Sequence, residues 1–372
     1  MKEEKRSGLV SMRQRHKGAA MRVWIKVVVG AAIVAHFAAG QTTAAQSSAV
    51  IAEARQMVAA HQLEKANELL TDYTQRNPAD KAALVELGQV QLAQGLSEDA
   101  LKSFEAVLRS LPDSVPARDG EIKAARAAAL TDRQAGLQDY ALLDLVRARE
   151  VVPDSPELLL DLGIQEESMR IFRDADEALT KARELAPQDA RILYALAHVE
   201  LDEQKMPEAE TNLRAYLKVR PEDATAHYGL GKLLHMLMRY DEAKAELQQS
   251  IALQPRQSAS YYELGEISLE QNQNSDAKSQ FQTALSFAPH HGGALTGMGI
   301  LAFRAKDYPA AEQYLKDAVL YASDYPKAHH YYALVLARLG REDEAKREAE
   351  LATSLDEQQT KTFRGNFLTV IH

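Results

Sequence analysis

An alanine that returns every 34 residues is the feature that most constrains the fold of this chain. Between Ala66 and Ala345, nine alanines keep this spacing except for one interval of 41. Most of them follow another glycine or alanine by 12 residues and precede a proline by 12. Small side chains at fixed places let two helices approach closely, so the pattern predicts a row of short helix pairs. The predicted packing residues are Ala66, Gly88, Ala100, Ala141, Gly163, Ala175, Ala197, Ala209, Gly231, Ala243, Gly265, Ala277, Gly299, Ala311 and Ala345.

The prolines and the polar residues after them divide the repeats from one another. Proline lacks a backbone donor and ends a helix, and a short oxygen-bearing side chain then caps the next one. The predicted caps are Asp80, Ser114, Ser155, Asp189 and Asp223.

Two segments carry nearly all of the pattern: YYELGEISLEQNQNSDAKSQFQTALSFAP at 261–289 and LLDLGIQEESMRIFRDADEALTKARELAP at 159–187. In their small residues and their closing proline they resemble the tetratricopeptide repeat family, and the bulky residue that this family has before the second helix is present in four repeats, at Phe172, Met206, Tyr240 and Tyr308. The resemblance runs from about residue 47 to 360 and implies an all-α fold, an α-solenoid superhelix of about nine helix-turn-helix repeats. The predicted repeats are 47–80, 81–114, 115–155, 156–189, 190–223, 224–257, 258–291, 292–325 and 326–359.

The third repeat is seven residues longer than the others. Its extra residues lie in EIKAARAAALTDRQ, which favours a helix, so we expect about two added turns, ~10 Å long. Such an extension would interrupt the superhelix between two front repeats and six rear repeats. After the polar last helix, residues 360–372 form a tail that is apolar again; it either packs against that helix or acts as a docking peptide.

The first 45 residues resemble an export signal. Eight basic residues flank or precede the apolar run VVVGAAIVAHFAAG, and small residues follow it. Cleavage after Gly40 or Ala45 would release the repeats outside the cytoplasm, in the periplasm or the medium. A permanent inner-membrane anchor is the weaker alternative, because the run is shorter than the ~20 residues of a spanning helix and contains His36. A third alternative is a buried helix of a soluble protein.

Charge and cysteine content exclude several kinds of site. The chain has 44 basic and 53 acidic residues; without the eight basic and two acidic residues of positions 1–45, these become 36 and 51, about −15 in all. Such an acidic body repels phosphate backbones, so nucleic acid is not an expected partner. With no cysteine, the chain has neither disulfides nor thiolate chemistry.

No motif predicts catalysis, a cofactor or a metal. Ser275 and Lys278 match a serine–lysine pattern, but they flank the packing residue Ala277 and no companion motif is present. The adjacent histidines at 290–291 and 329–330 point in different directions on a helix. We therefore expect that the protein is not an enzyme.

The family resemblance implies that the first helix of each repeat lines the concave face of the superhelix. The inward places from the fifth repeat onward are then occupied by Tyr194, His198, Tyr228, Lys232, His235, Tyr262, Glu266, Phe303, Arg304, His330 and Arg338. Three of them, Tyr194, Tyr228 and Tyr262, are 34 residues apart and predict an aromatic ladder along a groove. Tyrosine combines contact area with a hydroxyl and suits binding, although the same spacing also fits simple packing.

These features predict a noncatalytic adaptor of the bacterial envelope that binds a protein or an extended peptide in its groove. The alternatives are a carbohydrate-binding module that uses the tyrosine ladder, or an accessory subunit of a polysaccharide or glycosyltransferase system. Self-association is a further possibility, through the tail or through the apolar inner face of the front repeats at Ile51, Val58, Val85 and Leu92.

Overall fold

The computed structural model describes residues 44–362. The predicted export signal therefore lies outside the described residues, apart from its last two positions, and so do residues 363–372 of the tail. Among the described helices, none combines the length and the apolar character needed to span a bilayer. The chain forms two compact units, the N-terminal unit Met1–Pro153 and the C-terminal unit Asp154–His372, and each is all-α in its described part.

The N-terminal unit contains three helix pairs, each an antiparallel hairpin in the expected order. A helix at 44–59 precedes α2 (Leu63–Arg76), and α3 (Lys81–Ala93) precedes α4 (Ser97–Leu108). The third pair consists of α5 (Val115–Gln134) and α6 (Gln138–Val151).

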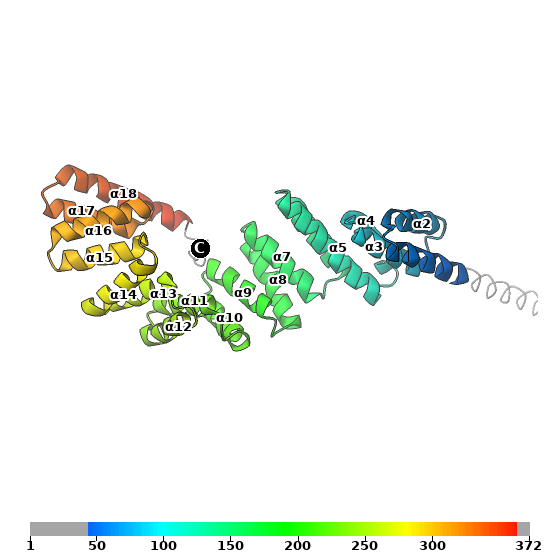
Figure 1. Cartoon of the computed structure of the whole chain (residues 1–372), viewed down its shortest axis with the longest axis horizontal. Coiled ribbons are helices and arrows are strands. Elements are labelled where there is room, and N and C mark those ends of the chain that lie inside the picture. The colour runs from blue at the N-terminus through cyan, green and yellow to red at the C-terminus, as the bar shows by residue number, and fades with distance from the viewer. Residues whose placement is uncertain (1–43, 363–372) are drawn as a thin grey trace, which may run out of the picture. The chain divides into compact units, whose positions relative to one another are not determined.

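The C-terminal unit contains six helix pairs, in which successive helices pack against each other in chain order (Figure 1). The first and second helices of the pairs are α7 (Pro156–Ser168) and α8 (Phe172–Leu185), α9 (Ala190–Asp202) and α10 (Met206–Val219), α11 (Ala224–Met236) and α12 (Tyr240–Leu253), α13 (Ser258–Glu270) and α14 (Asn274–Phe287), α15 (Gly292–Arg304) and α16 (Tyr308–Tyr321), and α17 (Pro326–Arg338) and α18 (Glu342–Thr362).

Small residues allow the helices of each pair to approach. All fifteen predicted packing residues are buried. A Cβ on Gly265 would lie 2.5 Å from the Phe281 ring, and one on Gly297 of the next pair would lie 2.4 Å from the same ring. Phe281 therefore occupies a slot between two glycines of successive pairs, and Phe104 has the same relation to Gly88 and Gly120.

Every first helix ends in the same tight turn. The residue two positions after the helix has positive φ, which favours glycine, yet only Gly95, Gly136 and Gly340 supply it. The other six turns place a side chain there: His61, Arg170, Gln204, Met238, Asn272 and Lys306. In the α3–α4 turn, the amide of Leu96 donates to Gln91 O at 2.9 Å and that of Gly95 to Leu92 O at 3.0 Å. This is the Schellman pattern.

Side-chain caps begin many of the first helices. The carboxylate of Asp80 accepts from the amide of Ala83, the hydroxyl of Ser155 from Leu158, and the carboxylate of Asp189 from Arg191. The expectation of a side-chain cap is wrong at Ser114, which accepts no such hydrogen bond. Pro116 in the first turn of α5 already removes one of the free amides that a cap would satisfy.

The added residues of the third repeat lengthen its first helix. α5 has 20 residues where α3 has 13, whereas α6 has the ordinary 14. Seven residues turn a helix by about 700°, within 20° of two full turns, so the same face is kept. Buried Ala117, Gly120, Ala124 and Ala128 accordingly follow one stripe along α5, which packs against both α4 and α6.

Candidate binding groove

The groove lies where two first helices of the C-terminal unit separate. Within the described part of that unit, α7 contacts α9, α11 contacts α13, α13 contacts α15 and α15 contacts α17, but α9 and α11 make no close backbone contact. An open groove of about 910 Å³ occupies this place. Its lining comes from α7, α9, the end of α10, the start of α11 and the end of α12: Ile164, Glu167, Ala190, Arg191, Tyr194, Ala195, His198, Tyr216, Arg220, Glu222, Asp223, Ala224, Thr225, Leu253 and Gln254.

The second residues of three successive repeats contact or face the preceding first helix. Tyr262 lies so close to Gly293 that a Cβ there would meet its ring at 2.7 Å, and Ala259 packs against the cluster that contains Tyr228. The corresponding residue of the α11 repeat is Thr225, which lines the groove together with Tyr194.

Three aromatic rings form one wall of the groove. The Tyr194 ring centroid lies 4.5 Å from that of His198 and 5.0 Å from that of Tyr216, both in tilted contact. Apolar side chains flank them, and Ile164 and Leu253 are each 38% exposed. A ligand in the groove would meet aromatic and aliphatic carbon on both sides.

Asp223 ties the aromatic wall to the start of α11. Its Oδ2 accepts a hydrogen bond of 2.6 Å from the Tyr216 hydroxyl, and its Oδ1 accepts from the amides of Thr225 and Ala226. Burial raises the pKa of Tyr216, and the Asp223 hydrogen bond and charge raise it further. The Asp223 carboxylate thus caps α11 and also holds the Tyr216 ring in place at the groove.

Three titratable groups in or beside the groove have pKa values shifted from their ordinary values. Burial raises the pKa of Glu167 to about 7, and the nearby charge of Asp202 adds to the rise. Burial also raises the pKa of Asp202, although the charge of Arg170 opposes this. Burial lowers the pKa of His198 to about 4, so its imidazole is neutral at pH 7. The Nε2 atom of His198 is buried and has no hydrogen-bond partner among the described residues.

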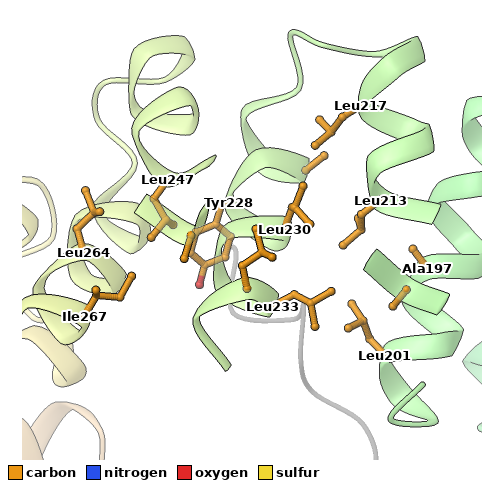
Figure 2. Packing of buried hydrophobic residues seen from close by; sticks show 14 residues of the cluster. Ala197, Leu201, Leu213, Leu217, Tyr228, Leu230, Leu233, Leu247, Leu264 and Ile267 are labelled. Carbon is orange, nitrogen blue, oxygen red and sulfur yellow. The ribbon is translucent and has the colours of Figure 1, made fainter. Parts of the chain in front are cut away.

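The predicted tyrosine ladder is wrong, because the three tyrosines occupy three different environments. Tyr194 lines the groove. Tyr228 is only 2% exposed and packs in a core cluster with Leu230, Leu264 and Ile267 (Figure 2). Tyr262 is wedged against α15, where its hydroxyl lies 3.3 Å from that of Tyr325.

The predicted charged positions on α11 and α13 are paired with other charges. His235 Nδ1 lies 2.9 Å from Glu263 Oε2, and its Nε2 lies 3.2 Å from Glu270 Oε2. Glu266 is buried and forms an ion pair with Lys327 of α17. Burial lowers the pKa of Lys232, while Glu263 counteracts the shift. These groups link different repeats, and their charges are largely satisfied within the protein.

The remaining predicted groove residues lie further along the chain. Phe303 packs between the rings of Tyr308 and Tyr331. The exposed Arg304 donates through Nη1 to Leu269 O at 3.1 Å and to Asn274 Oδ1 at 3.2 Å, so it secures the α13–α14 turn. His330 and Arg338 are exposed on α17. Of the eleven predicted residues, the structure brings only Tyr194 and His198 into the groove.

Sequence reasoning missed Ile164, Glu167 and Asp202 as a group. They occupy the ninth, twelfth and thirteenth places of their repeats, which are among the places predicted to face inward. The prediction began at the fifth repeat and therefore passed over Ile164 and Glu167 of α7, whereas Asp202 holds an inward place of the fifth repeat and was left out. Tyr216 and Asp223 lie on a second helix and in a turn, where the spacing of the first helices carries no signal.

The serine–lysine motif at Ser275 and Lys278 and the histidines were the other chemical groups considered in the sequence. The Ser275 hydroxyl donates to the carboxylate of its neighbour Asp276 on an exposed surface. Among residues 44–362, no three histidine or acidic side chains gather in an arrangement that would hold a metal ion.

Comparison with known proteins gives similarity at the level of repeats and fold. The family model described as tetratricopeptide repeat matches residues 51–115, 194–258, 237–291, 262–329 and 296–356. No curated protein matches the sequence.

Among solved structures, the APC/C hetero-tetramer Cut9-Hcn1 is similar at 17% identity, with 83% of this chain and 59% of that chain covered and a TM-score of 0.50. MamA is similar at 23% identity over 43% of this chain and 93% of its own, with a TM-score of 0.42. YrrB, described as a TPR protein with an unusual peptide-binding site, is similar at 21% identity over 50% and 96%, with a TM-score of 0.42.

At these identities the solved structures bear on the fold alone. The family model covers more than half of the residues, in both compact units, and its matches fall on the observed helix pairs. This chain belongs to the tetratricopeptide repeat family.

Proposed function

We propose that this protein is a noncatalytic scaffold that binds an extended segment of a partner polypeptide in the groove between α9 and α11. The observation that carries the proposal is the groove itself, an aromatic and aliphatic channel of about 910 Å³ with half-buried polar groups. Membership of a repeat family that presents extended surfaces supports it.

The groove chemistry suits a peptide. Aromatic and aliphatic walls provide apolar contact area, and a peptide backbone offers both donors and acceptors to unpaired polar groups such as His198 Nε2. Rings held by neighbouring contacts lose little conformational freedom on binding, which favours affinity.

Site-specific photo-crosslinking in cells tests the proposal. A photoreactive amino acid is placed at Ile164 of α7 or Leu253 of α12, which both line the groove, and at Leu320 of α16 as a control that is more exposed and outside the groove. We expect both groove positions to crosslink the same protein and the Leu320 position not to. Equal crosslinking from Leu320, or none from either groove position, would contradict the proposal.

We also propose that the protein acts in the bacterial envelope after export. The basic, apolar and small-residue succession of positions 1–45 supports this. Mass spectrometry of the protein recovered from fractionated cells should find a mature N-terminus at Gln41 or Gln46 in the envelope or periplasmic fraction. Recovery of the uncut chain in the cytosol would contradict export.

A further inference from the structure

Two acidic side chains beside the groove lack the partners that other acids of this region have. Glu167 lines the groove, and Asp202, in the last turn of α9, is close enough for its charge to act on Glu167. Among the described residues, neither carboxylate takes part in a hydrogen bond or an ion pair. Asp223 and Glu222, in the same groove, are bound by Tyr216 and Arg220.

Partly buried carboxylates without a partner are unfavourable in their charged form. Burial removes water from the charge, and a second carboxylate nearby adds repulsion. Among residues 44–362, Arg170 contributes an opposing charge at Asp202. A cation on a bound ligand would supply an opposite charge beside the carboxylates of Glu167 and Asp202.

The rest of the groove is compatible with a cation at this place. Tyr194 presents an aromatic ring, whose face attracts ammonium and guanidinium groups. His198 is neutral at pH 7 and does not repel them. The two arginines of the lining are each paired with an acid: Arg191 is 2.6 Å from Asp189, and Arg220 is 3.7 Å from Glu222.

We infer that the groove selects an extended peptide segment with a lysine or arginine side chain that lies against Glu167 and Asp202, beside the Tyr194 ring. The inference rests on the proposed function, since it names the chemistry of the segment that the scaffold binds.

The inference has a consequence for the effect of pH on binding. Because Glu167 of the free protein has a pKa of about 7, it is mostly protonated at pH 6 and must release its proton before it pairs with a cation. Asp202 acts in the same direction, Arg170 opposes it, and Tyr194 and His198 stay neutral between pH 6 and 8. A basic peptide should therefore bind about tenfold more tightly at pH 8 than at pH 6.

Selection from a displayed library of random nine-residue peptides tests the inference on the full chain. Peptides are kept when they compete with crosslinking from the Leu253 position, which confines them to the groove. We expect one peptide position to be enriched in lysine or arginine with the native protein and with Glu222→Gln, and this enrichment to be lost with Glu167→Gln. Glu222 is the matched control because it lines the same groove but is exposed and paired with Arg220.

The outcomes separate the inference from the proposed function. Groove-binding peptides without an enriched basic position would overturn the inference and leave the scaffold function standing. A library with no groove binder at all would overturn both. Fluorescence anisotropy of one selected peptide then gives a second readout: affinity should fall about tenfold at pH 8 in Glu167→Gln and lose its dependence on pH. Unchanged affinity in Glu167→Gln would also overturn the inference.

Discussion

At the residue scale, the repeat depends on glycines that leave no room for a methyl group. Gly265 faces the ring of Phe281, whereas Ala197 holds the equivalent place opposite Leu213 in another pair. The smaller and more flexible leucine therefore coexists with an alanine Cβ, and the planar phenylalanine ring requires glycine.

Gly265→Ala should destabilise the C-terminal unit by about 1–2 kcal/mol. The clash with Phe281 outweighs the ~1 kcal/mol that alanine gains over glycine in a helix. In a Phe281→Leu background, which recreates the Ala197–Leu213 pairing, the same substitution should be neutral or stabilising. Urea denaturation of the four variants measures the coupling, and additive effects would show that the ring contact is not the cause.

A second residue-scale feature is a buried acid in the third repeat. Glu121 of α5 is 0% exposed, and neither of its carboxylate oxygens has a hydrogen-bond partner among the described residues. Burial raises the pKa of Glu121 to about 8, the charge of Glu105 adds to the rise, and Arg147 opposes it. The folded state therefore holds a proton at neutral pH that the unfolded chain releases.

The stability of the N-terminal unit should accordingly fall as pH rises. Because this carboxyl has a pKa near 4.5 in the unfolded chain and about 8 in the fold, the folded state loses stability progressively between these pH values, by about 5 kcal/mol in all. Glu121→Gln should match the native protein at pH 5 and exceed it at pH 8, as measured by hydrogen exchange of α5 amides. Asp119→Asn, an exposed change of equal charge on the same helix, is the control. Equal pH profiles for Glu121→Gln and the native chain would contradict the prediction.

At the element scale, the geometry of the helix hairpins depends on the packing of their helices more than on glycine in their turns. Six of the nine turns use a side-chain-bearing residue where glycine would be unstrained, so the α-hairpin geometry is imposed by packing of the helices on each side. The turn between α11 and α12 is the clearest case, because Met238 has φ 57° and is 74% exposed.

Met238→Gly should raise the stability of the C-terminal unit by about 1 kcal/mol. The substitution relieves the left-handed backbone strain and removes little packing. Met236→Gly, at the end of α11 two residues earlier, is the matched control and should lower stability by a similar amount, since glycine is unfavourable in a helix. The midpoint of thermal unfolding distinguishes the two, and a loss of stability in Met238→Gly would show that the exposed side chain has a packing role.

At the scale of the whole molecule, the chain consists of two compact units of helix pairs. In repeat proteins each pair is stabilised mainly by its neighbours, and each compact unit contains contacts that stabilise its own pairs. Both units have their own buried residues, from Ala54 to Val152 and from Leu158 to Ala352.

We therefore expect fragments 44–153 and 154–362 to fold separately, each with the unfolding transition of its unit in the full chain. A fragment cut within the C-terminal unit, 154–257, should be less stable than 154–362, because it loses the packing of α12 against α13. Circular dichroism during urea denaturation measures this. A single cooperative transition in the full chain that neither fragment reproduces would contradict it.

The sequence by itself determined the helical fold and the positions that hold it together. A small residue buried between helices is a local requirement repeated nine times, so its spacing alone identifies Gly88, Ala175 or Gly299 as packing residues. The length of the insertion also predicted an extended helix, because the inserted residues are good helix formers.

Only the tertiary structure decided which equivalent places are open to a ligand. Tyr194, Tyr228 and Tyr262 are identical in residue type and register, yet one lines a groove, one is in the core and one is wedged against the next helix. The difference comes from the neighbouring repeat, where the approach of the next first helix sets how much of each ring stays uncovered. The periodicity of the sequence predicts the place of a residue within its own repeat. The exposure of its side chain depends on how that repeat contacts the next one.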